Sequence, residues 1–291
     1  MKRIILNIPL IFIVLISFGQ KLPVKMEEMT ALEFKDAVIK SNATCIIPIG
    51  VIEKHSTHLP LGTDLIDVRE ISLRAAEKEY AIVFPPYIFS QIFEAKHQPG
   101  TISYSAELLM KVLQETCDEL GRNGIKKIVI INGHGGNNSF LPFFLQTQLA
   151  SRKDYTVILY QDARPSPEVA AKIKKLMKPG PDGHAGQTET SRMLAHHPEL
   201  VHMDKVGLQS GEDLNRFTGV QGTTAIWWYA KYPNHYSGEA STSTTELGKL
   251  LIDENVEKIA SFLKQVKENE SIIKLQDQFY NESLDPMKTK Q

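Results

Sequence analysis

Carboxylate and imidazole side chains gather in a short segment that ends at Asp64. Glu53 and His55 are two residues apart, so both would point to the same side of an extended segment. Asp64 follows after a turn, and its carboxylate could bridge two ions. This mixture of donors suits Zn²⁺, Mn²⁺ or Fe²⁺ better than Ca²⁺ or Mg²⁺. Because the spacing is not a standard short metal motif, a solvated polar loop is the alternative.

A second group, Asn-Gly-His-Gly-Gly-Asn-Asn, begins at Asn132, directly after an apolar run. Glycines on both sides of His134 allow tight turns and close approach of a ligand, so Gly135 and Gly136 are candidate substrate contacts. A helix beginning at Asn137 would offer free backbone N–H groups to a developing negative charge. A lone histidine between glycines is otherwise often a turn residue.

A third group lies in residues 182–191, where a glycine-containing loop enters an amphipathic segment. His184 could serve there as a base, an acid or a ligand. Glu189 would lie in the first turn of the helix, as a ligand or as a partner of the helix dipole. Farther on, Trp227 and Trp228 are candidate walls of a substrate pocket, with core packing as the alternative for at least one.

The scaffold that must position these groups is predicted from alternating β-branched runs and longer amphipathic segments. Expected strands are residues 45–52, 81–84, 127–131 and 156–160. Expected helices are residues 65–79, 105–123, 137–152, 168–177, 189–196 and 245–268, with an irregular loop over 178–186. This alternation predicts one α/β domain over residues 20–291, with a mostly parallel sheet covered by helices on both faces. Ligands bind beyond the carboxyl ends of such strands, so Glu53 and His134 should converge.

The composition is ordinary for a globular protein, with 42% hydrophobic and 23% charged residues. A formal net charge of −1 and the absence of a basic run leave nucleic-acid binding without electrostatic support. Cys45 and Cys117 are too few to form a disulfide framework. They could pair in an exported protein, but we expect them to be buried free thiols. The sequence has no Gly-x-Ser-x-Gly elbow, so a serine hydrolase lacks support.

Residues 1–19 are typical of a secretory signal peptide. Lys2 and Arg3 precede the apolar run 4–18, and small residues suit cleavage near Gly19. The run is shorter than the roughly 20 apolar residues that a membrane span needs. We therefore expect an exported protein, periplasmic or secreted, without a stable membrane anchor. An uncleaved anchor or a buried helix is the alternative.

The motifs, taken in order, resemble those of the creatininase (creatinine amidohydrolase) family. Residues 53–64 are similar to its Glu-x-His-Gly-x-His-Leu-Pro-x-x-Thr-Asp element, and residues 132–137 match Asn-Gly-His-Gly-Gly-Asn. A Pro-Gly-Thr loop begins at Pro99, and a His-Ala-Gly-x-x-Glu-Thr-Ser element begins at His184. The similarity extends over most of the chain.

This resemblance implies a three-layer α/β/α fold and two divalent metal ions per chain. By motif, it implies that Glu53, His55, Asp64 and His134 are metal ligands, with Asp64 bridging the two ions. It also implies that His184 transfers protons. Members of the family commonly assemble as hexamers, so a homo-oligomer, and specifically a homohexamer, is expected.

This chain departs from creatininase itself at Gly136, where creatininase has a ligating glutamate. Glu189 is our candidate for the missing carboxylate, both as a ligand and as a catalytic group. Gly135 stands where creatininase has a substrate-contacting tyrosine, and Glu94-Ala95 stands where many relatives have Glu-His. These differences favour a substrate other than creatinine.

The sequence therefore predicts a metal-dependent amidohydrolase that cleaves the C–N bond of a cyclic or other small amide with metal-activated water. His184 would protonate the leaving nitrogen, which requires a group that titrates near neutral pH. His58 and Asn132 are expected to orient neighbouring ligands. The alternatives are a formamide hydrolase or peptidase of the same family, and a metal- or solute-binding protein without turnover.

Overall fold

The computed structural model describes residues 22–289, so the predicted signal peptide lies outside the described residues. Within this range the main sheet has four parallel strands in the order β2-β1-β3-β4. They are β1 (Thr44–Ile49), β2 (Ile82–Val83), β3 (Lys127–Asn132) and β4 (Thr156–Leu159). The predicted strands are therefore confirmed, with ends that differ by a few residues.

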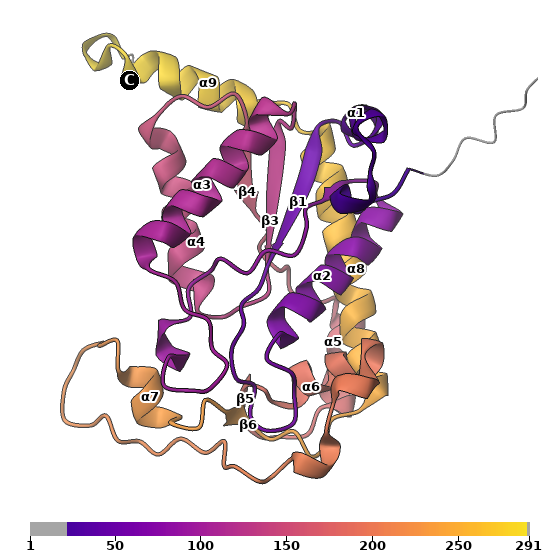
Figure 1. Cartoon of the computed structure of the whole chain (residues 1–291), viewed down its shortest axis with the longest axis vertical. Coiled ribbons are helices and arrows are strands. Elements are labelled where there is room, and N and C mark those ends of the chain that lie inside the picture. Colours follow the sequence, from indigo (N-terminus) through magenta and orange to yellow (C-terminus); the bar gives the residue numbers. More distant parts are fainter. Residues whose placement is uncertain (1–21, 290–291) are drawn as a thin grey trace, which may run out of the picture.

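Helices cover both faces of this sheet (Figure 1). One face carries α1 (Ala31–Lys40), α3 (Ala106–Arg122) and α4 (Asn137–Thr147). The other face carries α2 (Thr63–Lys78) and α8 (Thr245–Glu268). This arrangement confirms the predicted three-layer α/β/α fold.

Strand β1 is apolar at consecutive positions because both of its faces are buried. Cys45, Ile47 and Ile49 pack in the cluster that includes α3 and α4, whereas Ile46 packs in the cluster of α2 and α8. Cys45 and Cys117 are free thiols in the first of these clusters, as expected. Burial raises the pKa of the Cys117 thiol to about 12, so it stays protonated.

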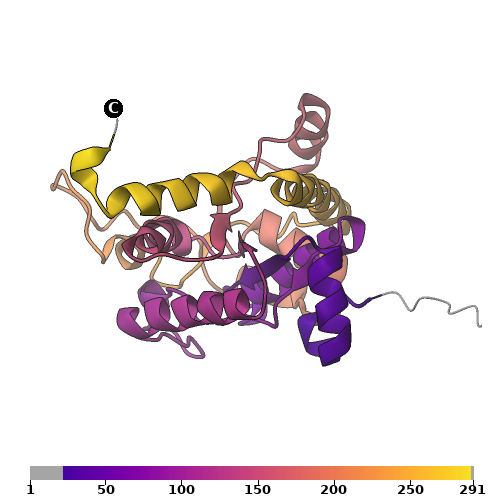
Figure 2. The same ribbon diagram turned by 90° about the horizontal axis from the view of Figure 1, so that it is seen from above.

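Three α-helices of the described residues were not predicted: α1, the short α7 (Trp227–Lys231) and the C-terminal α9 (Ser271–Ser283). Helix α9 lies near the β4 edge of the sheet (Figure 2), where the Tyr280 hydroxyl donates to the Gln148 carbonyl at 2.7 Å. Among residues 22–289, no helix is both long and apolar enough to cross a bilayer.

The carboxyl ends of the main strands face a region of short elements (Figure 1). These are α5 (Pro167–Leu176), β5 (Asp182–His184), α6 (Gln187–His196), α7 (Trp227–Lys231) and β6 (Ser237–Gly238). Strands β5 and β6 pair antiparallel. The prediction of an irregular loop over residues 178–186 was therefore wrong for residues 182–184, because pairing with β6 makes them a strand.

Close packing brings β3 against α2 at Gly133. A Cβ at this residue would lie 2.7 Å from the Cβ of Val68 and 2.8 Å from the carbonyl oxygen of Asp64. Only glycine permits this approach. The turn after β3 is thereby held beside the first turn of α2.

Candidate metal centre

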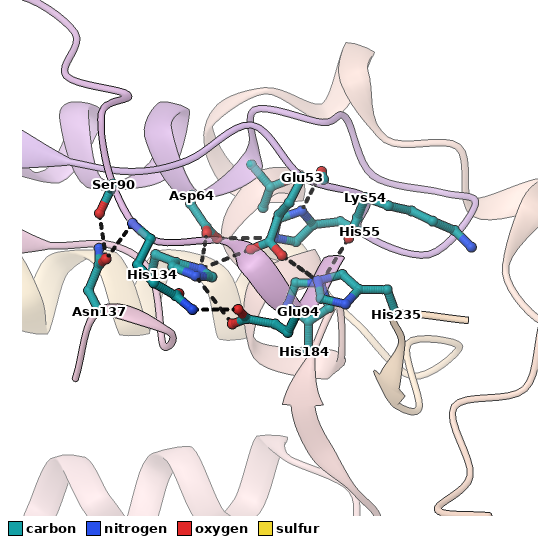
Figure 3. A network of polar contacts seen from close by, with 12 residues as sticks. Glu53, Lys54, His55, Asp64, Ser90, Glu94, His134, Asn137, His184 and His235 are labelled. Carbon is teal, nitrogen blue, oxygen red and sulfur yellow. Dashed lines mark hydrogen bonds and ion pairs between the residues drawn. The ribbon is translucent and has the colours of Figure 1, made fainter. Parts of the chain in front are cut away.

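Six ionisable side chains meet beyond the carboxyl ends of β1 and β3, and all of them except Glu189 are labelled in Figure 3. They come from the loop after β1, the first turn of α2, the turn after β3, and the segment of β5 and α6, and they are Glu53, His55, Asp64, His134, His184 and Glu189. The side chains of Glu53 and His55 are fully buried, and those of Asp64 and His134 are 5% and 6% exposed. The predicted convergence of Glu53 and His134 is confirmed, because Oε1 and Nδ1 lie 2.9 Å apart.

Asp64 lies between two histidines that follow different strands. Its Oδ1 is 3.0 Å from Nε2 of His55, and its Oδ2 is 2.9 Å from Nδ1 of His134. Each carboxylate oxygen therefore faces a separate imidazole. This is the placement that a carboxylate bridging two cations requires.

Around Asp64 the ligand atoms form two overlapping sets, each with its atoms within 4.8 Å of one another. Glu53 and His134 complete one set, and His55 and Glu189 complete the other. Glu189 Oε2 lies 3.8 Å from His55 Nε2. Two imidazoles and three carboxylates form a donor combination that Zn²⁺, Mn²⁺ and Fe²⁺ accept.

The charges at this centre depend strongly on one another. Burial lowers the pKa of His55, but Asp64 and Glu53 outweigh burial and raise it to about 10. Burial also opposes a charge on His134, yet the same two carboxylates hold its pKa well above the ordinary value. In the metal-free protein, protons on both histidines thus offset the carboxylates. A metal ion would replace these protons.

One buried oxygen tests whether a cation fits. Glu53 Oε1 has no hydrogen-bond partner among the described residues, although His134 Nδ1 lies 2.9 Å away. The same nitrogen also faces Asp64, and one imidazole N–H serves only one acceptor well. A cation placed among the three atoms would satisfy them all. The donor set therefore fits a divalent ion.

His184 stands beside this centre, with its ring centroid 4.3 Å from that of His55. Its Nε2 lies 2.9 Å from the carbonyl oxygen of Lys54, so Nε2 carries the hydrogen and Nδ1 is left to exchange a proton. Burial lowers the pKa of His184 to about 4. The expected pKa near neutrality is not found in the metal-free protein, because burial and the neighbouring His55 and His235 rings outweigh the carboxylate of Glu53, whose Oε2 lies 3.9 Å from Nε2 of His184.

The two residues expected to orient ligands take different positions. The Asn132 side chain bonds the backbone of His134 twice, accepting from its N–H at 3.1 Å and donating to its carbonyl at 2.9 Å. His58 bonds the Thr190 hydroxyl at 2.9 Å, and Thr190 follows Glu189 on α6. Asn132 therefore holds the turn of His134, whereas His58 reaches the centre only through α6.

The candidate substrate contacts are more scattered than the sequence predicted. A Cβ at Gly135 would meet no atom within 4 Å, so this position is open. The Asn137 side chain is fully buried, with Ser90 and Asn132 as its partners, so its expected substrate contact has no accessible group. Gly136 is enclosed by neighbouring polar side chains.

The two tryptophans also differ in their surroundings. Trp227 is 45% exposed, and its ring contacts that of Trp228. Trp228 lies edge-on to His184, with 6.1 Å between ring centroids. Trp228 therefore borders the centre, whereas Trp227 lies farther out, and its role as a wall of the substrate pocket stays a prediction.

Two residues at the centre escaped prediction. His235 bonds Glu53 through Nε2, and Glu94 Oε1 lies 3.9 Å from Nε2 of His134. His235 belongs to an aromatic segment with little periodicity, which gave no strand signal. Glu94 was noted in the sequence only as a departure from relatives.

Solved structures with the same fold are creatininases. A creatinine amidohydrolase (creatininase) structure superimposes with a TM-score of 0.69 at 24% identity, over 85% of this chain and 99% of that one. A structure described as creatininase Mn gives 0.69 with 24% identity, over 85% of this chain and 100% of that one. At this identity the similarity establishes the fold.

Sequence comparison extends the relationship. A family model described as creatinine amidohydrolase matches residues 27–263. The creatinine amidohydrolase of Pseudomonas putida is 30% identical over 195 residues, which cover 62% of this chain and 74% of that protein. A mycofactocin precursor peptide peptidase of Mycolicibacterium smegmatis is 30% identical over 170 residues, which cover 55% of this chain and 61% of that protein. The chain therefore belongs to the creatininase family of amidohydrolases.

Proposed function

We propose that this protein cleaves the C–N bond of a small amide with two divalent ions, Zn²⁺, Mn²⁺ or Fe²⁺, bound on either side of Asp64. Glu53 and His134 would complete one position, and His55 and Glu189 would complete the other. The observation that carries the proposal is the position of Asp64, whose two oxygens face two histidines at 3.0 and 2.9 Å.

Ions at these positions would supply Lewis acidity, which lowers the pKa of water and polarises an amide carbonyl. His184 is neutral at pH 7, so it would accept a proton at Nδ1 from the attacking water and then pass that proton to the leaving nitrogen. The Lys54 carbonyl fixes the orientation of this ring through Nε2. Trp228 borders the same side chain.

A peptide is the second candidate substrate, because relatives in two mycobacterial genera are described as peptidases of a precursor peptide. A formamide and a small cyclic amide are the other candidate substrates.

The test combines metal analysis with turnover. We expect about two transition-metal ions per purified chain, and loss in His134→Ala of the ion that Glu53, Asp64 and His134 would hold. We also expect hydrolysis of at least one member of a panel of cyclic amides, formamides and short peptides. A protein that takes up no Zn²⁺, Mn²⁺ or Fe²⁺ on reconstitution would refute the metal mechanism. A metal-loaded protein that hydrolyses none of the panel would favour the binding-protein alternative.

We also propose that the protein is exported and assembles as a homohexamer. The basic residues and apolar run within residues 1–19 support export, and the family resemblance supports the hexamer. N-terminal sequencing of protein recovered outside the cytoplasm should begin near Gln20. Light scattering of the purified protein should give about six times the mass of one chain.

A further inference from the structure

His235 contacts the metal centre from a loop far from Glu53 in the sequence (Figure 3). Its Nε2 bonds Oε2 of Glu53, the oxygen that does not face His134. Both side chains are buried, His235 at 2% and Glu53 at 0% exposure. The contact therefore lies on one oxygen of a predicted metal ligand and leaves its other oxygen for the ion.

A second hydrogen bond fixes which nitrogen of His235 carries the hydrogen. Nε1 of Trp228 lies 2.9 Å from Nδ1 of His235. An indole N–H can only donate, so Nδ1 of His235 must be the acceptor. The hydrogen of the neutral ring is then on Nε2, which donates to Glu53. Two hydrogen bonds therefore run in one direction, from Trp228 through His235 to Glu53.

The backbone at His235 is held in a conformation that few residues other than glycine adopt, with φ at +52°. Its N–H donates to the carbonyl of Tyr232 at 2.9 Å. The carbonyl of Pro233 accepts from Gln98 at 2.7 Å and from His97 at 2.9 Å. Such a conformation persists only where the surrounding structure holds it in place. Here the end of α7 holds it through Tyr232, and residues 97–98 hold it through Pro233.

We propose that Trp228 and His235 position Glu53 for metal binding, so that α7 helps to set the affinity of the site shared by Glu53, Asp64 and His134. This inference rests on the proposed function, because it takes Glu53 as a ligand. A fixed donor on one carboxylate oxygen fixes the direction of the other. Loss of a group that orients a ligand typically weakens metal binding by about 10- to 100-fold.

The first test needs no metal. Two-bond ¹H–¹⁵N correlations of histidine-labelled, metal-free protein report which ring nitrogen is protonated, and His235→Asn identifies the signal. We expect the Nε2–H form of His235 in the wild type and a mixture of forms in Trp228→Phe, which lacks the indole donor. A wild-type ring protonated on Nδ1 would overturn the proposed direction of the chain.

The second test measures the dissociation constant of Zn²⁺ by competition with a chelator. Trp228→Phe and His235→Asn should each weaken binding by about 10-fold or more. Asparagine tolerates positive φ, so His235→Asn spares the backbone. Tyr229→Phe is the matched control, because Tyr229 lies on the same helix, is 39% exposed and keeps its ring in the variant.

Two outcomes distinguish a failure of this inference from a failure of the proposed metal site. Unchanged Zn²⁺ affinity in Trp228→Phe, beside a wild type that binds Zn²⁺, would refute the positioning role and leave the metal centre intact. A wild type that binds no Zn²⁺ but keeps the Nε2–H form of His235 would refute the metal centre and with it this inference. The thermal midpoint of each metal-free variant checks that it remains folded.

Discussion

The carboxylate of Glu94 occupies the space that a side chain at Gly136 would need. A Cβ at Gly136 would lie 2.6 Å from Oε1 of Glu94 and closer than 3.0 Å to both His134 Nε2 and Gln91 Oε1. Gln91 in turn donates to Glu94 at 2.7 Å. A carboxylate from the short 3-10 helix before α3 therefore stands beside His134, whereas Glu189 stands beside His55.

Gly136→Ala should weaken Zn²⁺ binding by about 10-fold or more, because the new methyl group must displace the His134 ring or the Glu94 carboxylate. Gly135→Ala is the matched control, since a Cβ there meets no atom within 4 Å. Competition with a chelator measures both dissociation constants. Equal affinities in the two variants would show that the space beside His134 is not restricted.

Asp64→Asn should remove both ions, whereas Glu189→Gln should remove one. The reason is that Asp64 belongs to both sets of ligand atoms and Glu189 to one. Elemental analysis of the purified variants gives the number of ions per chain, and circular dichroism checks their fold. An Asp64→Asn variant that keeps one ion would contradict a bridging role.

Most of the fold was predictable because burial leaves a strong pattern in the sequence. β1 and β3 are apolar at consecutive positions, as strands covered on both faces must be. Helix α1 was missed although Thr30 and Glu33 form a capping box at its start, which is a recognisable signal. The pairing of β5 with β6 was not predictable, because strands of three and two residues have no periodicity.

The candidate site was predictable where its ionisable side chains come directly after a strand in the sequence. Glu53 and His134 come after β1 and β3, so the parallel sheet brings them to one edge. His235 gave no such signal, because its contact with Glu53 joins residues 182 positions apart. The burial that lowers the pKa of His184 could likewise not be predicted from the sequence, because it depends on how the chain packs around that residue.

Gly248→Ala should destabilise the protein by about 1–3 kcal/mol or more, because a Cβ there would overlap the carbonyl oxygen of Ser191 and force α8 away from α6. Since α6 carries Glu189, the same change should also weaken metal binding. Urea denaturation measures the free energy of unfolding. Gly222→Ala is the control, because a Cβ at Gly222 meets nothing within 4 Å, and an equal effect in both variants would contradict the packing argument.

The metal-free protein should lose stability as the pH rises from about 6.5 to about 10. His55 has a pKa of about 10 in the folded state, where its proton offsets Asp64, and about 6.5 in the unfolded state. Between these values the folded state binds more protons, so the free energy of unfolding falls with increasing pH. The stabilisation that the proton on His55 provides is fully present below pH 6.5. Thermal midpoints of chelator-treated protein from pH 6.5 to 10 measure the decline.

His55→Gln should flatten this decline, because glutamine cannot take up the proton, while His202→Gln at an exposed position should leave it unchanged. Zn²⁺ should flatten it as well, since an ion bound by His55 takes the place of the proton and stabilises the deprotonated ring. The metal-loaded wild type should therefore keep more of its thermal midpoint at pH 10 than the metal-free protein does. Parallel pH profiles of the wild type, His55→Gln and the Zn²⁺-loaded protein would contradict both the raised pKa of His55 and its place beside the ion.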